Sequence, residues 1–116
     1  MIIIAGTIDF ADQANRDGAV AAAADMQQST RDTESGCLAY SFAADSHVTN
    51  RVQVYELWAD AASLEAHFGH PNFWGMKELL GTFVRAGSSV AKYRVDATAP
   101  VYDAERRPTS GFNLDQ

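Results

Sequence analysis

The chain has 116 residues, of which 47% are hydrophobic and 21% are charged. This length fits one domain, and this balance is typical of a folded globular protein rather than of a disordered one. The formal net charge is −6 and the nine Lys and Arg residues form no basic cluster, which argues against nucleic acid and anionic membranes as partners. The single cysteine, Cys37, excludes an internal disulfide.

The chain opens with an apolar, Ile-rich segment. This segment has no basic residues before it, and Asp9 ends it too early for a signal peptide or a membrane span. A cytoplasmic location is therefore the simplest interpretation. Residues 2–10 form a short segment rich in β-branched residues, with apolar side chains on both faces of the strand that they would form. This pattern predicts a strand that is covered on both faces.

A long helix is expected next. Asp12 is a typical N-cap, because its carboxylate can accept hydrogen bonds from the first backbone N–H groups of a helix. Residues 13–33 follow, and alanine, the strongest helix former, dominates the middle of this range. Ser35 and Gly36 then interrupt the pattern, so we expect the helix to end before them.

Two strands follow the helix and are close enough in sequence to form a hairpin. Residues 37–42 alternate small and large side chains, which is the period of a strand, and this alternation puts Cys37 and Tyr40 on opposite faces. The polar segment 45–50 predicts a turn. Residues 51–58 are β-branched and aromatic, which predicts a third strand.

The second half of the chain predicts helical segments and a last strand. Asp60 is a suitable N-cap for a helix that starts at Ala61, and Pro71 interrupts it because the residue before a proline disfavours the helical conformation. A further helix is expected over about 73–83 and a fourth strand over 88–95. The resulting order, β-α-β-β-α-β, predicts a ferredoxin-like α+β fold with a four-stranded antiparallel sheet and helices on one face.

The predicted strands are apolar on both faces. In the third strand, Val54 and Trp58 alternate with Tyr55 and Leu57. Helices can cover only one face of such a sheet, so the other face needs a different cover. A second copy of the sheet is the obvious cover, and we therefore expect a homodimer, a dimeric α+β barrel.

The end of the chain differs in composition from the rest. We assign residues 1–98 to the domain and residues 99–116 to a C-terminal tail, because prolines and a Ser-Gly pair accumulate in the tail and apolar residues become few. The two prolines argue against a compact helix or hairpin there. We expect the tail to dock on an existing surface, for which the partner subunit is a candidate, through Val101, Tyr102, Phe112 and Leu114.

Two stretches of the chain carry a family resemblance. The first, residues 30–40, contains Glu-Ser-Gly-Cys-Leu-Ala-Tyr, and the second, residues 54–67, contains Tyr-Glu-Leu-Trp and ends in Ala-His. Together they resemble the antibiotic biosynthesis monooxygenase family, in particular its quinol-monooxygenase-like members, over about residues 1–96. The resemblance implies a dimeric barrel that oxidises a phenolic or quinol substrate with O₂ and uses no flavin, haem or metal.

His67 is the candidate catalytic base for such a reaction. The phenol must lose a proton before its anion can give an electron to O₂, and histidine exchanges protons readily near neutral pH. The resemblance also implies a pocket residue at this point, although a histidine at a helix end can instead cap carbonyl groups or be solvated. His70 lies three positions further on, but a zinc site needs three or four ligands and none of the other candidates is near, so we predict no metal.

Aromatic side chains that can stack on a planar quinol are the candidates for substrate binding. They are Phe68, Phe73 and Trp74 around the helix break, and Trp58 and Tyr55 on opposite faces of the third strand. Glu56 lies among apolar neighbours in that strand. Because an unpaired buried carboxylate is costly, we favour a structural role for Glu56, in which it bonds across the hairpin, anchors a backbone group, or pairs with Arg51 or Arg94.

Two other functions stay open at the level of sequence. An isomerase acting on a small keto compound would use the same pocket and His67 for proton transfer, without O₂. The third hypothesis is a protein that is not an enzyme, a dimeric ligand-binding or stress protein that uses the same pocket. Oxygen consumption with a panel of quinols separates the first hypothesis from these two, and a ligand that raises the melting temperature without turnover favours the last.

Overall fold

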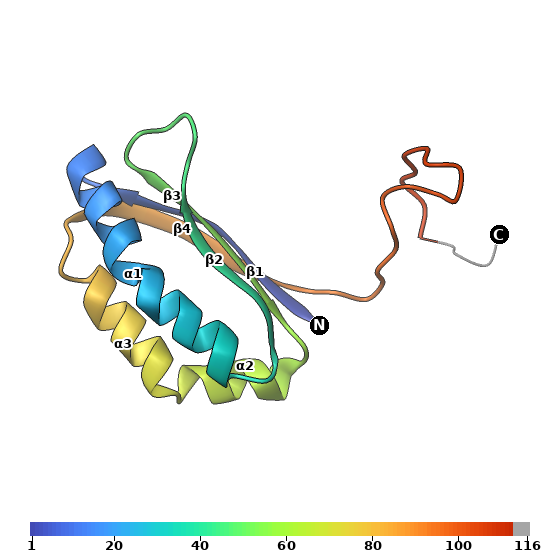
Figure 1. Ribbon diagram of the computed structural model, residues 1–116, viewed down its shortest axis with the longest axis horizontal. Helices are drawn as coiled ribbons and strands as arrows, with labels where there is room; N and C mark the ends of the chain where they lie inside the picture. The colour runs from blue at the N-terminus through green and yellow to red at the C-terminus, as the bar shows by residue number, and fades with distance from the viewer. Residues whose placement is uncertain (113–116) are drawn as a thin grey trace.

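Four strands and three helices form within residues 1–112, the part of the chain that the computed structural model describes (Figure 1). In chain order they are β1 (Ile2–Phe10), α1 (Gln13–Thr33), β2 (Cys37–Ala44), β3 (Arg51–Trp58), α2 (Ala61–Phe68), α3 (Pro71–Leu80) and β4 (Arg85–Arg94). The strands form one antiparallel sheet in the order β2-β3-β1-β4, and the helices lie on one face of it. The ferredoxin-like α+β fold is thus confirmed, and the sheet of a single chain is open.

The helices begin at the residues whose side chains cap them. The carboxylates of Asp12 and Asp60 each accept a hydrogen bond from the backbone N–H three positions later, at 2.8 Å and 2.7 Å. Helix α3 begins at Pro71, two residues before the predicted start, because the ring of His70 accepts a hydrogen bond from the N–H of Asn72 and proline needs no N–H in the first turn. None of these three helices is long and apolar enough to cross a membrane.

A bulge at the start of β2 corrects one sequence prediction. The register between β2 and β3 shifts between Cys37 and Ala39, so that Leu38 is an extra residue in β2. An extra residue reverses the alternation of side chains. Cys37 therefore lies opposite Trp58, on the same face as Tyr40 and not on the opposite one, and it packs against the core.

The core lies between the sheet and the helices. Its buried side chains come from β1, β2, β3 and the three helices and include Phe10, Ala23, Tyr40, Trp58, Leu64 and Met76. A buried polar side chain, Gln27, ties α1 to β2, because its amide donates to the carbonyl of Phe42 at 3.3 Å and accepts from the N–H of Phe42 at 3.1 Å. These paired bonds satisfy the polar atoms that the helix brings into the core.

Two parts of the sheet have no cover within residues 1–112. Every residue of β4 is exposed, because the helices lie mainly over the other strands (Figure 1). The face opposite the helices carries Ile3 and Leu57 and the half-exposed rings of Tyr55 and Tyr93. The arrangement expected from the two-faced strands, helices on one side and an apolar face on the other, is therefore present.

The tail contains a small hairpin, so the prediction that its prolines exclude one is wrong. Tyr102 and Pro108 face each other, and Asp103 and Thr109 donate backbone hydrogen bonds to the opposite arm at 2.9 Å and 2.8 Å. Pro108 stands at the position of this pair that donates no hydrogen bond, so its missing N–H costs nothing. Figure 1 shows the hairpin projecting away from the domain, and of the four predicted docking residues Leu114 lies outside the described residues.

Candidate functional site

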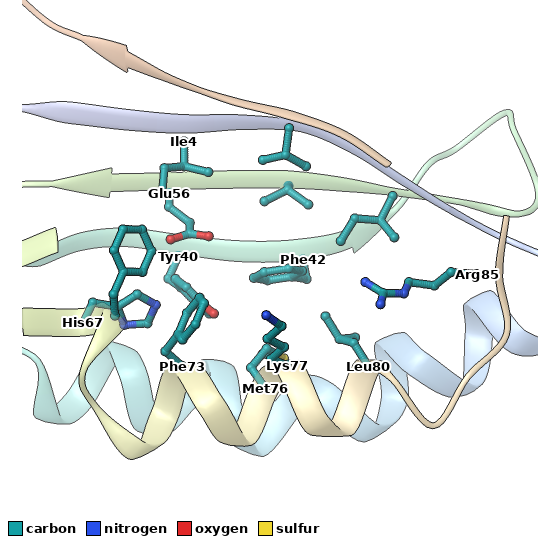
Figure 2. Close-up of a pocket in the computed structure, with 14 residues that line it drawn as sticks. Ile4, Tyr40, Phe42, Glu56, His67, Phe73, Met76, Lys77, Leu80 and Arg85 are labelled. Atoms are coloured by element: carbon teal, nitrogen blue, oxygen red, sulfur yellow. The ribbon is translucent and has the colours of Figure 1, made fainter. Parts of the chain in front are cut away.

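A cavity of about 290 Å³ lies between the sheet and α3 (Figure 2). Its walls are mainly apolar and include Ile4, Tyr40, Phe42, Phe73, Met76 and Val90. The walls come from all four strands and from α2 and α3, because the side chains of alternate strand residues share one face of the sheet. An apolar pocket with few polar groups is the usual form of a small-molecule site.

Besides the hydroxyl of Tyr40, four polar side chains interrupt the apolar walls, each from a different element. Glu56 comes from β3, His67 from α2, Lys77 from α3 and Arg85 from the start of β4. Figure 2 shows Glu56 and His67 at one end of the cavity and Arg85 at the other, with Lys77 between them. The acid–base groups and the cations are thus separated along the cavity.

His67 is held in place by Glu34. The ring is only 2% exposed, and its Nδ1 lies 2.8 Å from Oε1 of Glu34, at the C-terminal end of α1. The other carboxylate oxygen of Glu34 accepts from the side-chain amide of Asn72 at 3.1 Å. Because a carboxylate only accepts, Nδ1 carries a proton, which leaves Nε2 as the nitrogen that can take up or release a proton; no residue of 1–112 hydrogen bonds to Nε2. This is the arrangement of an oriented base.

Glu56 lines the cavity and has a different partner from those expected from the sequence. It is 7% exposed, lines the cavity, and accepts a hydrogen bond at 2.9 Å from the indole N–H of Trp58 and not from either arginine. Burial raises the pKa of Glu56 to about 7, against the opposing effect of the Trp58 N–H. Glu56 lies two residues from both Val54 and Trp58, and the alternation of a strand puts these three side chains on the same face of β3. This spacing is the sequence signal that indicates its burial.

Trp58 connects the two acid–base groups. Its ring centroid lies 4.4 Å from that of His67, with the planes tilted by 34°, while its N–H reaches Glu56. Trp58 is fully buried and lies behind His67, outside the cavity lining. It therefore supports the site from behind rather than presenting a surface to a ligand.

The other aromatic candidates divide between the cavity and the surface. Phe68 and Phe73 line the cavity next to His67, with ring centroids 6.0 Å and 5.5 Å from its ring. Tyr55 lies on the helix-free face of the sheet and is 42% exposed, and Trp74 points outward and is 56% exposed. The structure therefore brings two of the five predicted aromatics to the cavity and adds two from β2 that the analysis did not single out, Tyr40 and Phe42.

The two histidines of the helix break have separate structural partners. His67 is bound to Glu34, and the ring of His70 caps α3. Within residues 1–112, no group of three or more His, Cys, Asp or Glu side chains is placed to hold a metal ion.

Comparisons with known proteins agree with the fold. The profile of the family described as antibiotic biosynthesis monooxygenase matches residues 1–78. A solved structure from Deinococcus radiodurans, described as a candidate antibiotic biosynthesis monooxygenase, is 19% identical and covers 89% of this chain and 100% of its own, with a TM-score of 0.72. One from Caulobacter crescentus with the same description is 19% identical and covers 84% of this chain and 91% of its own, with a TM-score of 0.71. No curated protein matches the chain.

Proposed function

Because this chain belongs to the antibiotic biosynthesis monooxygenase family, we propose that it is a cofactor-independent monooxygenase that oxidises a quinol or polyphenol with O₂. The observation that carries the proposal is the pair of His67 and Glu34, an oriented base at the wall of an apolar cavity. Aromatic side chains such as Phe42 and Phe73 line the cavity, and such side chains can stack on a planar ring.

The chemistry starts with a proton. Nε2 of His67 takes the hydroxyl proton of the quinol, and Glu34 stabilises the imidazolium that forms. The resulting phenolate is electron-rich enough to pass an electron to O₂, and the oxygen then bonds to a ring carbon. Loss of water leaves a hydroxyquinone, so that quinol and O₂ give hydroxyquinone and water with no outside reductant.

Glu56 can transfer the second proton that this reaction requires. Its pKa of about 7 lets it act as an acid or as a carboxylate near neutral pH. It lies at the same end of the cavity as His67 (Figure 2). As an acid it can donate to the departing water, and as a carboxylate it can accept from the second hydroxyl of the quinol.

Oxygen uptake with a panel of quinols, in the presence of a chelator, tests the proposal. The informative variant is His67→Asn, because the asparagine amide can still donate to Glu34 while the Nε2 lone pair is lost. We expect turnover per folded molecule to fall by about 10²- to 10⁴-fold. His47→Asn, in the exposed turn between β2 and β3, is the matched control and should leave turnover unchanged.

His67→Ala is a less useful test of the catalytic base, because it also disturbs the buried surroundings of the ring. The ring fills a buried site between Trp58 and Phe73, so its removal leaves a cavity and takes from Glu34 its hydrogen bond to His67, with only that from Asn72 left. If His67→Asn folds and keeps wild-type oxygen uptake, His67 is not the base. Oxygen uptake that depends on an added flavin or metal would contradict the cofactor-independent reaction.

The pairing of two acid–base groups also favours a second candidate function. An isomerase that moves a proton along a small keto compound needs one group to take the proton and another to return it, and His67 and Glu56 at one end of the cavity suit both roles. Such an enzyme would convert its substrate without oxygen uptake, at equal rates in air and under nitrogen. This comparison separates the two candidates.

A further inference from the structure

The cavity has a cationic side that the proposed reaction does not use. Lys77 of α3 and Arg85 of β4 both line it (Figure 2). Neither forms an ion pair with any of the residues 1–112. The Nζ of Lys77 instead lies 5.3 Å from the centroid of the Trp74 ring, which holds the side chain beside the cavity without neutralising its charge.

These two cations are unusual in a chain of net charge −6. Glu56, the one carboxylate in the lining, lies at the end opposite Arg85 and already accepts a hydrogen bond from Trp58, while Glu34, outside the lining, is bound to His67. The cavity thus has its acid–base groups at one end, Arg85 at the other and Lys77 between them, and an anion bound at the Arg85 end would meet no acidic neighbour in the lining.

We infer that the substrate of this cavity is an aromatic compound with a carboxylate on the end remote from the ring that is oxidised. The inference rests on the proposed function for the orientation of the ring, whose hydroxyl must reach His67. The guanidinium of Arg85 matches a carboxylate geometrically through two parallel N–H donors, and Lys77 adds a mobile charge. The apolar walls between the two ends then hold the ring system.

Ligand binding without turnover tests this inference. A hydroxynaphthoic acid and the corresponding naphthol differ only in the carboxylate, and calorimetry under nitrogen measures the affinity of both for the full chain. We expect the acid to bind about tenfold more tightly at low salt, and this preference to shrink as the ionic strength rises. The double variant Lys77→Gln/Arg85→Gln should lose the preference and keep the naphthol affinity.

Arg107→Gln is the matched control, because it also removes a positive charge but lies in the tail hairpin, with its side chain 75% exposed. It should keep the preference for the acid. Equal affinity for the two compounds in the wild type overturns the inference, as does a preference that survives in the double variant or a failure of both compounds to bind. A carboxylate preference without oxygen uptake from any quinol upholds the inference about charge and rejects the oxygenase.

Discussion

Glu56, at the scale of single residues, couples the cavity to the stability of the fold. Burial raises its pKa from the ordinary value of 4.5 to about 7. A group whose pKa is raised by folding favours the folded state fully below about pH 4.5, and this contribution is lost as the pH rises through about 7. We therefore expect Glu56→Gln, which cannot ionise, to become more stable relative to the wild type across this window, by about 3 kcal/mol at the alkaline end.

Urea unfolding of both proteins at several pH values measures this difference. Glu65→Gln, on the exposed side of α2, is the control, and its unfolding free energy should follow that of the wild type at every pH. A difference between Glu56→Gln and the wild type that does not change with pH would show that the buried carboxyl does not titrate as expected.

Gly6, at the scale of elements, sets how closely β1 and β4 can approach. Its φ is +156°, and an added Cβ would lie 2.0 Å from the carbonyl oxygen of Ser89 and 2.6 Å from the Cα of Val90. Both are backbone atoms, so Gly6→Ala must displace β4, which carries Arg85 and Val90 into the cavity wall.

We expect Gly6→Ala to lower the free energy of unfolding by about 2–3 kcal/mol, measured by chemical denaturation, and to weaken ligand binding. Gly87→Ala, with open space around its Cβ position, is the control and should change neither; similar losses in both variants would refute the steric explanation.

Two apolar surfaces, at the scale of the whole molecule, have no cover within residues 1–112. One is the helix-free sheet face with Tyr55 and Tyr93, and the other is the tail, where Val101, Tyr102 and Phe112 are each more than 60% exposed. We expect a two-fold homodimer in which sheet faces sheet and the tail docks on the partner, with about 1,600 Å² or more of buried surface.

Deleting residues 99–116 should then weaken the dimer, as measured by sedimentation at micromolar concentration, or broaden ligand access to the cavity. A wild-type monomer refutes the dimer, and unchanged association and kinetics after the deletion refute the role of the tail.

Local signals in the sequence determined the elements and their order. The bounds of β1, α1 and β3 agree with the prediction, because capping by Asp12, the alanine run and β-branched periodicity act over a few residues and are visible in the chain itself. The same short-range patterns predicted the ferredoxin-like order and the family, and they singled out His67. They also indicated an apolar second face of the sheet, since alternation alone assigns strand residues to faces.

The tertiary structure alone decided which distant groups meet. Glu34 and His67 are 33 positions apart, and no local pattern pairs them. The bulge at Leu38, which turns Cys37 to the core face, depends on how β2 pairs with β3, and the tail hairpin accepts Pro108 only because its backbone N–H is not needed there. The raised pKa of Glu56 follows from its burial in the folded chain, since the pKa of a carboxyl is set by the groups that surround it in space.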